Sequence, residues 1–79
     1  MSPLGWIEKN WVNRHRFSVV TKVSDMKHQI ELTIIGADGQ TSTYVGFGQN
    51  KHQCKMSAAK QAMVDITRAE KVQSLPGVI

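Results

Sequence analysis

Two lysines and a histidine stand close together where a helix is expected to begin. Lys51, His52 and Lys55 follow Asn50, which can cap the helix, and no acidic residue lies in this stretch. Cations are unfavourable at a helix start, because the unpaired N–H groups there carry partial positive charge. Those N–H groups, with two lysine side chains at i and i+4, can bind an anion. The cluster therefore indicates phosphate binding.

The residues before this cluster favour the same chemistry. Gly46 and Gly48 flank a phenylalanine and let the backbone turn sharply and lie close to another surface. We expect the backbone N–H groups of Gln49 and Asn50, which come next, to assist in holding the anion. The alternative is an ordinary solvated helix start after a strand-to-helix turn, and glycine plus lysine alone leave both interpretations open.

Composition bounds the kind of protein and its partners. A chain of 79 residues holds one domain, and its 10 Lys and Arg against 6 Asp and Glu leave a net charge of +4, which favours an anionic partner. The single cysteine, Cys54, cannot form an internal disulfide, so we expect a reducing, intracellular setting. Either nucleus or cytoplasm is consistent with this, and we slightly favour the nucleus. No apolar run approaches the roughly 20 residues that span a bilayer, and no membrane partner is expected.

Other site chemistries find no support in the residue spacing. Serine, histidine and cysteine occur without a spacing that recommends a triad or dyad, so we expect no catalytic residues and no enzyme. His15, His28 and His52 fall on separate expected elements, and one cysteine without paired spacing predicts no metal site. No cofactor is expected. Cys54 is expected to pack as a small apolar residue.

The elements that must position the cluster follow from periodicity. Ser2 before Pro3 predicts a helix over 3–13, and β-branched residues predict a strand over 17–23, with Phe17, Val19, Thr21 and Val23 on one face. Alternation predicts a second strand over 28–35, and a tight turn leads to a third over 41–47. The inward side chains of the second strand are Ile30, Leu32 and Ile34. Helical spacing of alanines predicts a last helix over 50–68.

This order of elements predicts an α+β fold. We expect an α-β-β-β-α two-layer sandwich, in which both helices cover one face of a three-stranded antiparallel sheet and the other face is open to water. The domain is expected to span 1–70, with a C-terminal tail over 71–79. The chain is expected to be one module of a larger protein.

The last segment carries a family resemblance. From Gly46 to Met63 the sequence resembles the C-terminal signature of the double-stranded RNA-binding domain family, G-x-G-x-S-K-K-x-A-K-x-x-A-A. The matching residues are Gly46, Gly48, Lys51, Lys55, Ala58 and Ala59. Asn50 stands in place of the serine and His52 in place of the middle lysine. The family has the α-β-β-β-α order, so the resemblance covers nearly the whole chain.

The resemblance implies binding of double-stranded RNA by shape and phosphate contacts, with little sequence specificity, over about 16 base pairs. It implies that Lys51, Lys55 and His52 hold phosphates, with His52 binding better when protonated, and that backbone groups at Gln49 and Asn50 assist.

Two further regions are implied to reach neighbouring minor grooves. In the first helix, Glu8 aligns with an acidic residue that the family offers to a ribose hydroxyl, or Lys9 replaces it. In the turn between the first two strands, Lys27 or His28 would reach a phosphate or a ribose hydroxyl. The family's longer loop with its Gly-Pro-x-His sequence is missing, because only residues 24–28 lie there.

These departures keep a second function open. In this alternative the chain is a degenerate member of the same fold that mediates protein contact or self-association, through a strand edge or a helix. A third function, binding of single strands by stacking, would need aromatic side chains on the open face of the sheet, where only Tyr44 is a candidate.

Overall fold

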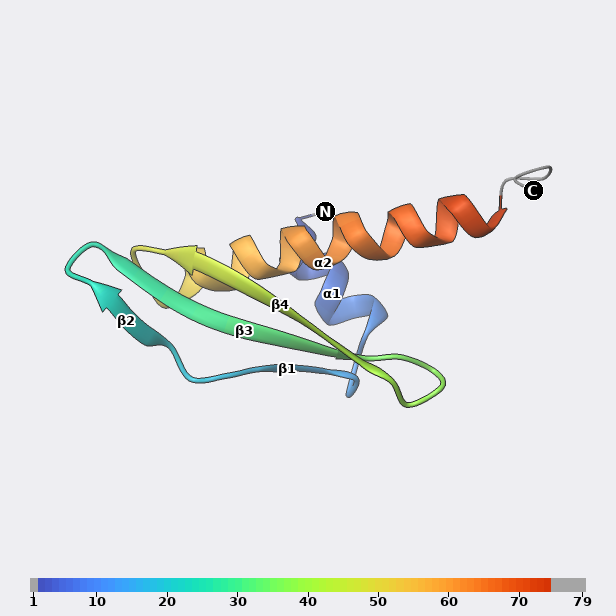
Figure 1. Ribbon diagram of the computed structural model, residues 1–79, viewed down its shortest axis with the longest axis horizontal. Helices are drawn as coiled ribbons and strands as arrows, with labels where there is room; N and C mark the ends of the chain where they lie inside the picture. The colour runs from blue at the N-terminus through green and yellow to red at the C-terminus, as the bar shows by residue number, and fades with distance from the viewer. Residues whose placement is uncertain (1, 75–79) are drawn as a thin grey trace.

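Two helices and an antiparallel sheet make up the part of the chain that the structure describes (Figure 1). The computed structural model describes the backbone of residues 2–74 and the side chains of residues 2–69. In chain order the elements are α1 (Pro3–Asn10), β1 (His15–Phe17), β2 (Thr21–Ser24), β3 (Lys27–Ile35), β4 (Thr41–Gly48) and α2 (Lys51–Ser74). The predicted α+β class is therefore confirmed.

The sheet is built around β3. This strand pairs antiparallel with β4 on one side and with both β1 and β2 on the other. The expected strand over 17–23 thus corresponds to one edge of the sheet. This edge begins earlier than expected, at His15, and is divided into two short strands, β1 and β2. The sheet has four strands where three were predicted, but the predicted meander describes their layout.

An extra residue divides this edge. Phe17 pairs with Leu32 and Thr21 pairs with Gln29, so four positions along the edge match three along β3. A bulge of this kind moves the following side chains to the other face of the sheet. The prediction that Phe17, Val19, Thr21 and Val23 share one face is therefore wrong, because Phe17 pairs with the inward-facing Leu32 and Thr21 with the outward-facing Gln29. Phe17 packs against the core, whereas Val19 is 85% exposed.

Helix α1 is shorter than predicted. It begins as expected, because Ser2 Oγ accepts an N–H of the first turn at 3.1 Å. It ends at Asn10 rather than at residue 13, since Trp11 leaves the helical conformation at φ −124° and ψ 40°. Asn13 then adopts φ 62°, a left-handed conformation that asparagine tolerates better than most residues. The chain turns there to enter β1.

The core lies between β3 and the two helices, which pack on the same face of the sheet (Figure 1). Ile30, Leu32 and Ile34 face inward as predicted, and Cys54 packs among apolar residues as a buried free thiol. The helices contribute Ile7, Cys54, Ala58, Ala59 and Ala62. Because most α2 core residues are small, the helix lies close to the sheet.

Helix α2 is longer than the predicted 50–68. It begins after Asn50 and runs to Ser74, and the first residue after Lys51 that disrupts helices is Pro76. The first residues of the expected tail over 71–79 are thus helical, and 75–79 lie outside the described residues. No helix in the described part of the chain combines the length and the apolar character needed to cross a membrane.

Candidate nucleic-acid interface

The start of α2 is closed by reciprocal hydrogen bonds. Asn50 Oδ1 accepts the N–H of Gln53 at 2.9 Å, which confirms the predicted cap, and Gln53 Oε1 accepts the N–H of Gln49 at 2.8 Å. The Gln49 N–H is thus already donated within the chain, contrary to the expectation that it assists an anion. Among the described residues, the N–H groups of Asn50, Lys51 and His52 have no acceptor. These three groups remain to bind an anion, and they include the Asn50 backbone group expected to assist.

The two glycines before the helix serve packing. A Cβ on Gly46 would overlap the carbonyl oxygen of Cys54 and the backbone nitrogen of Ala58. A Cβ on Gly48 would lie 2.5 Å from the Cβ of Gln53. The two glycines therefore allow β4 to lie close to α2. Their effect on the site is indirect, because they fix where the helix starts relative to the sheet.

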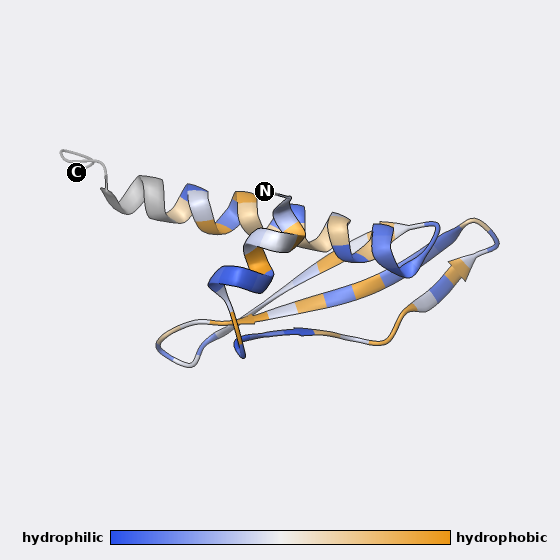
Figure 2. Cartoon of the chain, turned by 180° about the vertical axis from the view of Figure 1, so that it is seen from behind, coloured by the Kyte–Doolittle hydropathy of each residue, from blue (hydrophilic) through white to orange (hydrophobic). Residues whose placement is uncertain are grey.

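The predicted cations differ in how firmly they are held. Lys51 and His52 are exposed on the hydrophilic first turn of α2 (Figure 2). Lys55 is half-buried, and its Nζ lies 5.0 Å from the centre of the Phe17 ring on β1. The first turn carries no acidic residue, and none of the three cations forms an ion pair with a described residue. The positive charge at this helix start is thus not neutralised within the described chain.

The β2–β3 turn places its two predicted residues on opposite faces of the sheet. Lys27 Nζ lies 4.4 Å from the centre of the Phe47 ring, on the open face. His28 faces the helices and pairs with Gly48, which contacts Gln53 in the first turn of α2. Its Nδ1 is buried without a hydrogen-bond partner. The structure thus brings His28 toward the start of α2 and leaves Lys27 on the other face.

Helix α1 presents the remaining two candidates. Glu8 and Lys9 are both exposed, next to the fully buried Ile7 that anchors α1 in the core. Because α1 packs against α2, these side chains belong to the same layer as the α2 cations, but on a different element (Figure 1).

A second set of polar contacts, which the sequence analysis did not identify, joins α2 to β4. Ser57 Oγ accepts the N–H of Phe47 at 3.2 Å, and Gln61 Nε2 donates to the carbonyl oxygen of Val45 at 2.7 Å. These backbone groups lie on the side of β4 that faces away from β3, where an edge strand is normally unpaired. Helix α2 therefore covers part of this sheet edge. The sequence feature that could have revealed these contacts is the four-residue spacing of two polar residues, Ser57 and Gln61, on an alanine-rich helix.

Tyr44 completes this row of contacts. Its hydroxyl donates to Asp65 Oδ2 at 2.5 Å, and Tyr44 lies on the helix side of β4 rather than on the open face expected for stacking. Burial, followed by the hydrogen bond and the negative charge of Asp65, raises the pKa of Tyr44 to about 12. Sequence reasoning also missed Phe17, because its contact with Lys55 joins distant parts of the chain.

Within the described residues there is no group of three or more His, Cys, Asp or Glu side chains that would hold a metal ion. A scan against models of known protein families finds no match, and a search of curated proteins finds no similar sequence.

Proposed function

We propose that this chain binds double-stranded RNA by placing the start of α2 against backbone phosphates. The observation that carries the proposal is a helix start with exposed Lys51 and His52, three N–H groups without an acceptor among the described residues, and no acid in the first turn to offset them. A phosphate is the ligand that such a helix end favours. Lys55, held beside Phe17, adds a second lysine on the adjoining surface.

The proposal predicts recognition without base reading. Lysine contacts to phosphates position a protein on a duplex but carry no sequence information. Affinity then depends on the release of counterions, so it falls steeply as salt concentration rises. His28 faces the helices, near the first turn of α2, while Glu8 and Lys9 extend the same layer, which supports a contact surface longer than α2 alone.

The test compares two variants of the same helix in binding to a duplex RNA of about 16 base pairs. Lys51→Gln with Lys55→Met removes two charges but keeps the apolar stem that packs on Phe17. The control, Lys60→Gln, removes one charge from another side of α2. We expect the double variant to bind about tenfold more weakly, which corresponds to about 1.4 kcal/mol. The control should bind within about twofold of the unmodified chain.

Salt dependence provides the second readout. Each phosphate contact that is lost should reduce the slope of log affinity against log salt by about one. An unchanged affinity and slope in the double variant would contradict the proposal. A loss in Lys60→Gln about half as large, on a logarithmic scale, as the loss in the double variant would reduce the proposal to a general effect of net charge, because the control removes one charge instead of two.

A second candidate function, protein contact or self-association, is favoured by one observation. Apolar side chains are exposed around the β2–β3 turn, with Val23 at 50%, Met26 at 69% and Phe47 at 41%. Exposed apolar groups that gather in one place are typical of protein contact surfaces. Sedimentation of the isolated chain distinguishes the two functions, because a dimer without RNA affinity supports contact and a monomer that binds duplex supports recognition.

A further inference from the structure

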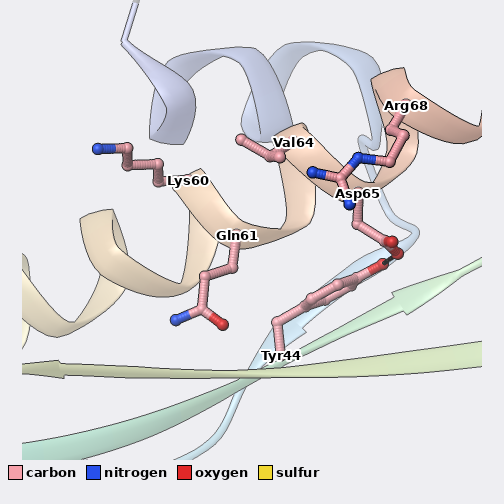
Figure 3. A pocket seen from close by; sticks show the side chains of 6 residues that line it. All are labelled: Tyr44, Lys60, Gln61, Val64, Asp65 and Arg68. Atoms are coloured by element: carbon pink, nitrogen blue, oxygen red, sulfur yellow. Dashed lines mark hydrogen bonds between the residues drawn. The ribbon is translucent and has the colours of Figure 1, made fainter. Parts of the chain in front are cut away.

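A groove lies where α2 meets β4. Tyr44 of β4 and five residues of α2 line it, and its volume is about 470 Å³ (Figure 3). The lining residues are Tyr44, Lys60, Gln61, Val64, Asp65 and Arg68. Nothing in the proposed RNA contact uses these side chains.

Three of these residues form a stripe along the helix. Lys60, Val64 and Arg68 follow one another at four-residue intervals, which places them on one side of α2 at steps of about 6 Å. Val64 is 43% exposed between the two cations. The stripe thus presents an apolar centre with a positive charge at each end.

The acid in the groove is already engaged. Asp65 accepts the hydroxyl hydrogen bond of Tyr44, as the dashed line in Figure 3 marks, and it forms no ion pair with Lys60 or Arg68. Among the described residues, neither cation has an acidic partner within ion-pair distance. The groove is therefore complementary to a ligand with two separated negative charges. The Asp65 carboxylate in its wall and the apolar Val64 disfavour a polyphosphate chain.

The groove is separate from the proposed RNA contact. Each residue turns an α-helix by about 100°, so Lys60 lies about 140° around α2 from Lys55. Lys55 contacts Phe17 on β1, whereas Gln61 contacts Val45 on β4, and β1 and β4 flank opposite sides of β3. The two surfaces are therefore open to different partners at the same time.

We propose that this groove binds an extended acidic peptide with the pattern acid-x-apolar-x-acid. In an extended chain, alternate side chains point to one side at steps of about 6.6 Å, close to the 6 Å steps of the stripe. The first acid pairs with Lys60, the apolar side chain covers Val64 and the ring of Tyr44, and the second acid pairs with Arg68. The partner is thus a protein segment, and the chain joins duplex RNA to it.

The test is an NMR titration of the 79-residue chain with two peptides of identical composition. The first, acetyl-Glu-Thr-Leu-Thr-Glu-amide, places leucine on the side of the acids. The second, acetyl-Glu-Leu-Thr-Thr-Glu-amide, turns leucine away from them. We expect the first peptide to shift the amide signals of residues 60–68 and to bind about fivefold more tightly, because only its leucine is buried.

Two variants sharpen the test. Arg68→Gln should weaken the first peptide by about two- to fivefold, as loss of an exposed ion pair does. Asp65→Asn keeps a hydrogen-bond partner for Tyr44 and removes the one acidic side chain among the described residues that line the groove, so binding should strengthen. Lys51→Gln should leave peptide binding unchanged. Equal affinity for the two peptides, or shifts that lie away from both Tyr44 and residues 60–68, would overturn the proposal without affecting the RNA proposal.

Discussion

The ammonium group of Lys55 lies 5.0 Å from the centre of the Phe17 ring, so the first strand of the sheet holds a cation of the last helix. Lys55 is half-buried while Lys51, one turn earlier, is exposed. A cation over an aromatic face is attracted by the ring and loses part of its side-chain freedom. The contact therefore orders one of the two lysines before any ligand arrives.

This relationship predicts an effect of Phe17 on RNA affinity. Phe17→Leu keeps an apolar residue at the core edge but removes the aromatic face. A cation–π contact at an exposed site contributes about 0.5–1 kcal/mol, so duplex RNA affinity should fall by about two- to fivefold in fluorescence anisotropy. In a chain that already carries Lys55→Met, the same substitution should cause no further loss of affinity. An additive loss would show that Phe17 acts independently of Lys55.

The contact of β4 with α2 predicts a large loss of stability at one glycine. Gly46→Ala would place a methyl group against the backbone of Cys54 and Ala58, which cannot move without shifting α2. We expect the free energy of unfolding, measured by urea denaturation, to fall by about 1–3 kcal/mol or more. The control is Gly36→Ala, because its nearest contact is the end of the exposed Asp38 side chain at 3.0 Å, which can move away at the expense of one hydrogen bond from the Gln40 N–H. Similar losses in both variants would contradict this account.

Tyr44 makes a prediction about high pH. It is the only tyrosine, so ultraviolet absorbance of the phenolate reports on it alone. Its pKa in the folded chain is about 12, against 10.0 for the free side chain. The folded state thus holds this proton more tightly, and the contribution to stability is present below pH 10 and is lost as pH rises from about 10 to about 12. Asp65→Asn should lower the folded midpoint, and a midpoint near 10 in the unmodified chain would contradict the contact.

The covered edge of β4 predicts a link between stability and association. Ser57→Ala with Gln61→Ala removes the side chains that occupy the backbone groups of Phe47 and Val45. Two lost hydrogen bonds should reduce the free energy of unfolding by about 1–3 kcal/mol. The freed edge should also increase concentration-dependent association in sedimentation. If the variant associates no more than the unmodified chain, α2 does not protect this edge.

Local patterns predicted the elements well where one face of an element is buried. The alternation around Ile30, Leu32 and Ile34 identified β3, since each of these side chains meets the helices and each polar neighbour points away. Asn50 was identified as a cap because its role depends only on the next three residues. The class of the fold follows from such patterns.

Features that depend on distant residues could not be predicted in the same way. The bulge in the first edge depends on the register with β3, and it moved Val19 to solvent although its residue type favours a strand interior. Lys27 lies on the open face of the sheet, whereas α2 packs on the other face. The spacing of residues along the chain does not reveal this separation. The contact between Tyr44 and Asp65 likewise joins two elements whose alignment only the packed fold defines.

The most direct test of the central claim is an NMR titration of the chain with a duplex RNA of about 16 base pairs. Our account predicts that the backbone amide signals of Lys51, His52 and Lys55 shift first, because phosphates approach the start of α2. Signals of Lys60 and Arg68 should stay in place. Unchanged signals throughout residues 49–55 at saturating RNA would contradict the account.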